Sequence, residues 1–243
     1  MKLNLTIDSG NSSTKLSLFD GDKFVGTERY KQFDAEMLRS FFARYDIGAA
    51  IVSSVVGSNA EAENFLASRV PLVKLSSSTP LPLKLRYRSA NTLGCDRIAT
   101  AVQAWSVNPG AASLIVDVGT ATTLDVVDAQ GCFMGGNISP GITMRLRSLN
   151  MLTTLLPLAD KEGDMPLVGY DTTTALRSGA VRGLAYEIDG TIGSLQAEMP
   201  GITTFLTGGD AAIVRGMLAH KVVCDPDMLA KGLNRILLYN EKI

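Results

Sequence analysis

Two short stretches of the chain place a carboxylate, a glycine and several hydroxyl side chains directly after an apolar run. The clearer one is DVGTATT at residues 117–123, which follows the apolar residues 113–116. Gly119 lets the backbone approach a ligand with no Cβ in the way. The threonine hydroxyls and the N–H groups of the turn can donate to phosphate oxygens, and Asp117 can hold a cation or a metal-bound water beside them. The stretch predicts a phosphate-binding turn between two paired strands.

The same pattern occurs once before, as DSGNSSTK at residues 8–15 after another apolar strand. By position, Asp8 corresponds to Asp117 and Thr14 to Thr123. Each copy leads one half of the chain, so the repeat predicts two similar subdomains that face each other across a nucleotide-binding cleft. Two hairpins that bind nothing are the alternative interpretation, because a single Asp-x-Gly is common in turns.

Composition limits the class of protein. The 243 residues carry a net charge of −1, which lacks the basic excess expected of a nucleic-acid binder. The three cysteines have no paired spacing, so neither a disulfide framework nor a zinc site is indicated. There is no signal-peptide pattern and no apolar run near the ~20 residues of a membrane helix. We therefore expect a soluble, cytoplasmic α/β protein.

The only histidine is His220, which we expect at a helix end, where it would interact with the helix dipole. A Ser-His-Asp or Cys-His nucleophilic site is therefore not expected. If the chain is an enzyme, its general base should be a carboxylate.

The elements that must position these residues can be read from hydrophobic periodicity. In the first half we expect strands at residues 2–7, 15–19, 24–30, 49–56 and 72–75, with helices at 35–45 and 61–70. Asp34 is the expected N-cap of the first helix. The second half repeats the strand meander, so each half should form a mixed five-stranded sheet with flanking helices. The expected domains are residues 1–110 and 111–243.

Between the halves, Gly94-Cys95-Asp96-Arg97 leads into an expected helix from Ile98 to Trp105. A carboxylate in the first helical turn is stabilised by the positive end of the helix dipole. A guanidinium there can donate two parallel hydrogen bonds to a ligand carboxylate. The alternative is that Asp96 is an ordinary N-terminal helix acid and Arg97 a surface charge.

The second half contains further glycine-rich segments. Residues 135–141 (GGNISPG) are expected to form a loop before a helix at 143–156, and residues 160–169 a flexible connection. A long helix at 175–199 is rich in small residues, which would suit a subunit interface. The pair Gly208-Gly209 at a strand-to-helix junction would suit the base or ribose of a nucleotide, with a tight turn as the alternative.

Together these motifs resemble the type III pantothenate kinases of the acetate and sugar kinase/Hsc70/actin superfamily. The similarity covers nearly the whole chain in the family's order. It rests on Asp8-x-Gly10-Asn11-x-x-x-Lys15, Gly94-x-Asp96-Arg97, residues 117–123, Gly135-Gly136-x-Ile138-x-Pro140-Gly141, Thr172 with Ser178-Gly179, and Thr207-Gly208-Gly209. The resemblance implies duplicated actin-like (ribonuclease H-like) subdomains and ATP-dependent phosphorylation of pantothenate, the first step of coenzyme A synthesis.

The resemblance also implies cofactors, partners and site residues. It implies ATP with Mg²⁺, a monovalent cation (K⁺ or NH₄⁺), a homodimer, and no nucleic-acid or membrane partner. Asp96 would be the catalytic base, Asp117 would hold the monovalent cation, and Asp8 would hold Mg²⁺ through ATP. ATP binding falls to Asp8, Ser9, Gly10, Asn11, Ser12, Ser13, Thr14, Lys15, Thr120, Gly208 and Gly209. Pantothenate binding falls to Tyr87, Gly94, Cys95, Asp96, Arg97 and Thr172.

The sequence departs from the family pattern at Ser12, Ala90 and Asp171, where Thr, Pro and Asn are common. Phosphoryl transfer itself needs positioning, charge neutralisation and a proton acceptor, all of which these residues can supply. Two alternatives stay open. One is a nucleotide-gated regulatory protein of the same fold, and the other is a kinase for a different small hydroxy acid or sugar.

Overall fold

The computed structural model describes residues 2–10, 13–54 and 59–242. The chain forms two compact units. The first contains Met1–Val107, Gly131–Phe133 and Asp227–Ile243, and the second contains Asn108–Gln130 and Met134–Pro226. The C-terminal segment is thus part of the first unit. The division at residue 110 into two evolutionary halves, and the cleft between them, stay predictions.

The first unit is built on a five-stranded sheet of order β3-β2-β1-β4-β5. The first three strands form an antiparallel meander, and β4 and β5 continue the sheet in parallel. The strands are β1 (Leu3–Ser9), β2 (Thr14–Asp20), β3 (Lys23–Tyr30), β4 (Ile47–Ser54) and β5 (Leu72–Lys74). The helices are α1 (Ala35–Arg44), α2 (Ala60–Arg69), α3 (Cys95–Val107) and α7 (Met228–Asn240), with a short 3₁₀ turn, η1, at Ala90–Thr92.

Alternation along β1 decides which residues face which helices, because successive side chains point to opposite sides of a strand. Leu5 and Ile7 are fully buried in the core with α1 and α2. On the opposite face, Asn4 donates from Nδ2 to Oδ1 of Asn234 on α7, at 3.2 Å. Asp8 follows the same alternation as Asn4, so it lies on the face that carries α7.

The predicted first helix is confirmed, with Asp34 as its N-cap. The Asp34 side chain accepts a hydrogen bond from the N–H of Met37 at 2.8 Å. Such a cap satisfies one of the N–H groups that a helix leaves unpaired at its start.

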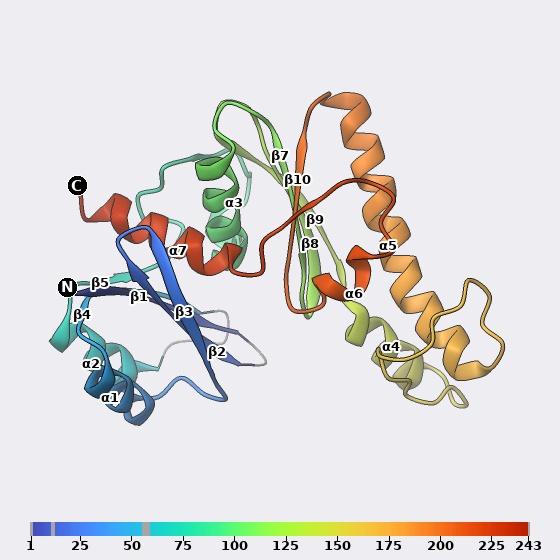
Figure 1. Ribbon diagram of the computed structural model, residues 1–243, viewed down its shortest axis with the longest axis horizontal. Helices are drawn as coiled ribbons and strands as arrows, with labels where there is room; N and C mark the ends of the chain where they lie inside the picture. Colours follow the sequence, from blue (N-terminus) through green and yellow to red (C-terminus); the bar gives the residue numbers. More distant parts are fainter. Residues whose placement is uncertain (1, 11–12, 55–58, 243) are drawn as a thin grey trace. The chain divides into compact units, whose positions relative to one another are not determined.

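The second sheet has six strands in the order β11-β10-β7-β8-β9-β6. Strand β6 and the first two residues of β9 belong to the first unit, and the other strands belong to the second unit. One short strand, β6, was not predicted; it pairs with Cys132 and Phe133 at the start of β9. The other short strand, β11, pairs with β10 at the opposite edge, where the sequence predicts a strand at residues 222–223. The strands are β6 (Lys84–Leu85), β7 (Ser113–Val118), β8 (Ala121–Val127), β9 (Cys132–Pro140), β10 (Thr203–Thr207) and β11 (Val223–Cys224). The helices are α4 (Ile142–Leu152), α5 (Thr172–Glu198) and α6 (Ala211–Arg215). Figure 1 shows α5 running along one face of the sheet.

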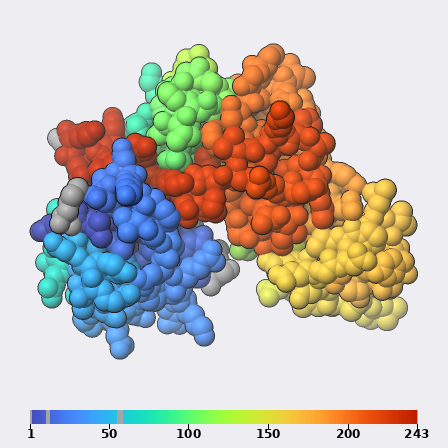
Figure 2. Space-filling model, in the orientation of Figure 1, coloured from blue at the N-terminus to red at the C-terminus, as the bar shows by residue number. Residues whose placement is uncertain are grey.

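A connecting segment, residues 153–171, joins α4 to α5 without helix or strand. Figure 2 shows this part of the chain, in yellow, on the surface of the second unit. Among the described residues, no helix combines the length and apolar character required to cross a membrane.

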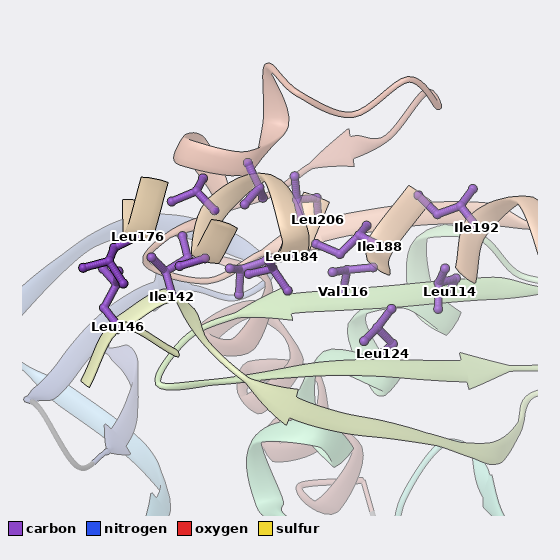
Figure 3. Close-up of a cluster of buried hydrophobic side chains, with 14 of the residues drawn as sticks. Leu114, Val116, Leu124, Ile142, Leu146, Leu176, Leu184, Ile188, Ile192 and Leu206 are labelled. Atoms are coloured by element: carbon purple, nitrogen blue, oxygen red, sulfur yellow. The ribbon is translucent and has the colours of Figure 1, made fainter. Parts of the chain in front are cut away.

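The core of the second unit lies between α5 and the sheet. Val116 and Leu124 of the sheet face Leu184 and Ile188 of α5, and all four are at most 2% exposed (Figure 3). Each side chain of this kind contributes roughly 1.5–3 kcal/mol when it is fully buried. This packing fixes α5 against β7, in which Asp117 is the last residue but one.

The predicted loop at residues 135–141 was wrong, because Cys132–Pro140 forms strand β9. A Cβ on Gly136 would lie 2.1 Å from the carbonyl oxygen of Leu124 on the neighbouring strand. The glycine therefore serves close strand packing, not a flexible loop. The helix that follows is α4, which ends at Leu152 instead of the predicted residue 156.

Candidate active site

The first hairpin places a carboxylate opposite an ammonium group. In the β1–β2 ladder Asp8 is paired with Lys15, and Ser9 with Thr14. The hydroxyls of Ser9 and Thr14 lie 3.3 Å apart. Asn11 and Ser12 of the predicted ATP loop lie outside the described residues.

Strand pairing matches the residues of the two hairpins differently from a count along the sequence. Asp117 of β7 is paired with Thr123 of β8. The residue of the first hairpin at this place in the ladder is Lys15, and not Thr14 as the counting of residues suggested. The first hairpin thus sets a cation opposite its aspartate, where the second sets a hydroxyl.

Asp8 has an unusual electrostatic environment. Burial raises the pKa of its carboxyl to about 6, Lys15 opposes this shift, and the negative charge of Asp96 adds to it. Asp8 and Asp96 are therefore electrostatic neighbours within the first unit. Two carboxylates that repel each other at a partly buried position form a place where a cation would be stabilised.

Asp96 is held by the first turn of α3. Its Oδ1 accepts a hydrogen bond from the backbone N–H of Arg97 at 2.8 Å, and the helix N-terminus favours its negative charge. A Cβ on Gly94 would lie 2.3 Å from the same oxygen, so a glycine leaves room for this carboxylate. Burial and the charge of Asp96 raise the pKa of the Cys95 thiol, which disfavours its use as a nucleophile.

Arg97 stacks on two aromatic rings. Its Cζ lies 5.5 Å from the ring centroid of Tyr87 and 5.7 Å from that of Phe133, and the two rings meet edge to face at 5.9 Å. Arg97 is only 6% exposed, so it is not the surface charge of the alternative interpretation. A desolvated guanidinium over an aromatic face gains cation–π energy of up to about 2 kcal/mol.

The second hairpin presents Thr120 to solvent. Thr120 is exposed at the turn between β7 and β8, whereas Thr122 is fully buried and its hydroxyl has no hydrogen-bond partner. Of these two threonines, only Thr120 is accessible to a ligand. A Cβ on Gly141 would lie 2.2 Å from the carbonyl oxygen of Gly119, so the start of α4 packs directly on this turn.

The glycine pair after β10 lies against the end of β7. Gly208 has φ +101, and a Cβ at this position would lie 2.5 Å from Oδ1 of Asp117. Only glycine adopts this conformation readily and fits the space. Gly209 has open space around its Cβ position. The structure therefore brings together Asp117, Gly208 and Gly209 within the second unit.

Thr172 begins the long helix α5 and is exposed. Asp171 is the N-cap, and its side chain accepts from the N–H of Thr174 at 2.7 Å in a reciprocal capping box. Hydrogen bonds from Thr174 lower the pKa of Asp171. The helix thus starts at Thr172, three residues before the predicted start, with Thr172 in its first turn.

Comparisons with known proteins decide the family. The family model for type III pantothenate kinase matches residues 4–194. A type III pantothenate kinase of Phocaeicola vulgatus is 39% identical over 243 residues, covering 99% of this chain and 100% of that one. A second, of Bacteroides fragilis strain ATCC 25285, is 41% identical over 242 residues, covering 98% of each. The chain belongs to the type III pantothenate kinase family.

Solved structures show the fold. A Campylobacter jejuni protein assigned to the Baf family of transcriptional activators superposes with a TM-score of 0.62 at 20% identity, over 98% of this chain and 100% of that one. Component A of the Acidaminococcus fermentans (R)-2-hydroxyglutaryl-CoA dehydratase gives a TM-score of 0.55 at 14% identity, over 98% and 97%. The predicted actin-like fold with two mixed sheets is confirmed, but the second sheet has six strands instead of the predicted five, because β6 adds to its edge.

Sequence reasoning missed the role of one residue, Phe133, and misplaced another, His220. Phe133 lies outside the motifs assigned to the site, and its contact with Arg97 is created only by the tertiary fold. His220 was expected at a helix end, but α6 already ends at Arg215. Its Nδ1 instead lies 2.9 Å from Oδ1 of Asp189 on α5, which supports a structural role. No local sequence signal could have revealed this contact between residues 31 positions apart.

Proposed function

We propose that this chain is an ATP-dependent pantothenate kinase, which forms 4′-phosphopantothenate in the first step of coenzyme A synthesis. The observation that carries the proposal is the repulsion between the partly buried carboxylate of Asp8 and that of Asp96, with Lys15 opposite Asp8 on the neighbouring strand. Type III pantothenate kinases about 40% identical to it over nearly its full length support the same substrate and reaction.

The residues around Asp8 fit ATP and Mg²⁺. Mg²⁺ usually binds to one or two carboxylates together with substrate phosphates and waters, and a desolvated carboxylate next to a second one suits such an ion. Among the described residues no group of three or more His, Cys, Asp or Glu gathers, which agrees with a metal held largely through the nucleotide. Bound Mg²⁺ would neutralise phosphate charge. Lys15 and the hydroxyl of Ser13 would hold the phosphates in line. Ser9 and Thr14, which are buried and whose hydroxyls lie 3.3 Å apart, would support this turn from within the sheet.

Asp96 would accept the proton of the primary hydroxyl of pantothenate. Its carboxylate is oriented by the N–H of Arg97, so it needs no rearrangement to act. In a loose phosphoryl-transfer transition state the proton leaves late, and a carboxylate is basic enough for this step. Arg97, packed on Tyr87, would contact a polar group of the substrate, and Gly94 and Cys95 would complete this part of the pocket. Thr172 stays a predicted pantothenate contact of the second unit.

We assign the monovalent cation, K⁺ or NH₄⁺, to Asp117. Such ions prefer oxygen ligands, and backbone carbonyl and carboxylate oxygens gather where Gly208 packs on Asp117 and Val118. Thr120, Gly208 and Gly209 would then contact the nucleotide next to the ion. We also propose that the enzyme works in the cytoplasm.

We further propose a homodimer formed through the outward face of α5. Gly179, Gly183 and Gly190 have no atom within 4 Å of their Cβ positions, and Tyr186, on the same stripe, is 56% exposed. Large apolar side chains of the neighbouring connecting segment are also exposed, including Leu155, Leu167, Val168 and Tyr170, as is Leu152 at the end of α4. Two other small residues of α5, Ser178 and Ala185, are buried and do not belong to this outward face.

A coupled ADP-release assay, with and without pantothenate and in K⁺ and then Na⁺, tests the proposal. We expect ADP release that requires pantothenate and is faster in K⁺. ADP release that ignores pantothenate would favour the nucleotide-gated regulator, and release triggered by another alcohol in a substrate panel would favour a kinase for that compound.

Replacement of the base gives a sharper test of the mechanism. In Asp96→Asn we expect kcat to fall by roughly 10²–10⁴-fold, because general base catalysis is lost, while ATP binding in calorimetry persists. Asp22→Asn makes the same change at a surface carboxylate of the same unit, paired with Arg235, and should leave turnover unchanged. Normal turnover in Asp96→Asn would remove Asp96 as the base.

A further inference from the structure

The connecting segment is fastened along its length to α5, although its sequence predicts a flexible connection. Arg177 donates to the carbonyl oxygens of Asp160 and Asp164, at 2.8 and 3.0 Å. Arg182 donates to Met165, and Ser178 to Pro166, both at 2.8 Å. Backbone carbonyls that accept side-chain hydrogen bonds in this way hold a defined conformation.

One side chain of this segment reaches away from α5. The Nζ of Lys161 lies 2.5 Å from Oδ1 of Asp210. Asp210 is only 8% exposed, and the side chain of Lys161 is one-third exposed. A buried carboxylate is unfavourable unless a cation or hydrogen bonds compensate its lost hydration. Lys161 therefore supplies charge that the buried Asp210 requires.

Asp210 directly follows the glycine pair assigned to the nucleotide. Its N–H donates to the carbonyl oxygen of Val118 at 2.9 Å, and Gly208 packs on Asp117 next to it. The conformation of the turn at residues 207–210 thus depends on where the Asp210 side chain is held. Lys161 is 49 residues away in sequence but adjacent in the fold.

We propose that Lys161 is a positioning residue for nucleotide binding, which acts through its ion pair with Asp210. The pair holds the Gly208-Gly209 backbone in the conformation that accepts ATP. This inference rests on the proposed function, because it takes the glycine pair to be a nucleotide contact. A lysine that only attached the connecting segment to the sheet would affect stability without affecting ATP affinity.

Lys161→Met removes the cation and leaves Asp210 buried without it. If only about a tenth of the molecules then hold residues 207–210 in the conformation that accepts ATP, the apparent dissociation constant of ATP rises roughly tenfold. We expect KM for ATP to rise by this factor, while kcat and KM for pantothenate change less than about twofold. Lys161→Arg, which keeps the charge, should restore most of the ATP affinity.

The experiment compares these variants of the full chain by steady-state kinetics and by calorimetric titration with ATP. Asp210→Asn removes the buried charge itself, so its ATP affinity tests the same turn through the other partner of the ion pair. Combining Asp210→Asn with Lys161→Met should cost less than the sum of the single changes, as expected for residues that act together. Lys221→Met, at an exposed lysine of the same unit, is the matched control and should behave as wild type.

Two results would overturn the inference. One is a normal ATP affinity in Lys161→Met with a lowered melting temperature, which would make the pair a structural attachment only. The other is full additivity of the two changes. If instead the wild-type chain neither binds ATP nor consumes it with pantothenate, the proposed function fails and this inference fails with it. A kinase whose Lys161 variants keep normal KM for ATP would overturn the inference alone.

Discussion

At the level of single residues, the candidate site carries an electrostatic cost that its ligands would relieve. Asp8 has a pKa of about 6 instead of 3.8, a difference that corresponds to up to about 3 kcal/mol. In the ligand-free protein this carboxylate is ionised at neutral pH against burial and against Asp96. A cation at the same place would convert that cost into binding energy.

The Asp8→Asn variant should therefore be more stable than wild type and yet inactive. Because the folded-state pKa is raised, the native protein binds the extra proton between about pH 4 and pH 6, and stability falls as pH rises through this window. Above about pH 6, the protein bears the full free-energy cost of an ionised, buried Asp8. In thermal unfolding of the ligand-free chain we expect Asp8→Asn to melt several degrees higher at pH 8. The difference should shrink towards pH 4.

The matched control is Asp22→Asn, whose carboxylate is largely exposed and which should show no such pH-dependent gain. If Asp8→Asn melted at or below the wild-type temperature at pH 8, the pairing of Asp8 with Lys15 would outweigh its burial. The cation-binding argument for this position would then fail.

At the level of elements, α3 carries the predicted base and α7 fixes its position. A Cβ on Gly232 of α7 would lie 1.8 Å from the carbonyl oxygen of Ala99 on α3, so the two helix backbones are in direct contact. We expect Gly232→Ala to lower the free energy of unfolding by about 3 kcal/mol, because neither backbone can yield without repacking. It should also lower kcat, since Asp96 lies in the first turn of α3.

Urea unfolding and steady-state kinetics measure both effects. Gly216→Ala is the control, because its Cβ position is open and its φ of −69 suits alanine. This change should be neutral or stabilising by up to about 1 kcal/mol. An equal urea midpoint for the two variants would mean that α7 does not fix α3.

The local elements were largely predictable from the sequence, and the contacts between distant segments were not. The two hairpins and α1 follow from alternation, apolar spacing and a capping aspartate, which are all local signals. Gly136 misled the prediction, because a glycine that lets two strands approach has the same local sequence as one in a loop. The ion pair of Lys161 with Asp210 joins segments 49 residues apart, and no local pattern encodes it.

The part of the candidate site that lies in short sequence motifs could be predicted from the sequence. Asp96 and Arg97 follow Gly94 in one short run, so their proximity needs no knowledge of the fold. The electrostatic contact of Asp96 with Asp8 depends on which face of the first sheet α3 covers. That choice is made by tertiary packing such as the contact of Gly232 with Ala99, and it could be inferred only from resemblance.

At the level of the whole molecule, the remaining question is why α5 leaves one face uncovered. Its inner face is buried on the sheet, and its 27 residues extend about 40 Å at 1.5 Å per residue. Glycines along the outer face cost helix stability, about 1 kcal/mol each relative to alanine. A partner helix that packs closely on those glycines would offset this cost.

The Gly179→Arg variant tests the interface directly. In a single chain the Cβ position of Gly179 is open, so an arginine fits there and should favour the helix. In a dimer packed on this face the same side chain would prevent close approach. We expect light scattering to show a dimer for wild type and a monomer for Gly179→Arg, with KM for pantothenate raised because Thr172 begins the same helix. Gly26→Arg, at an equally open glycine of β3, should remain dimeric. A dimeric Gly179→Arg would move the interface to another face.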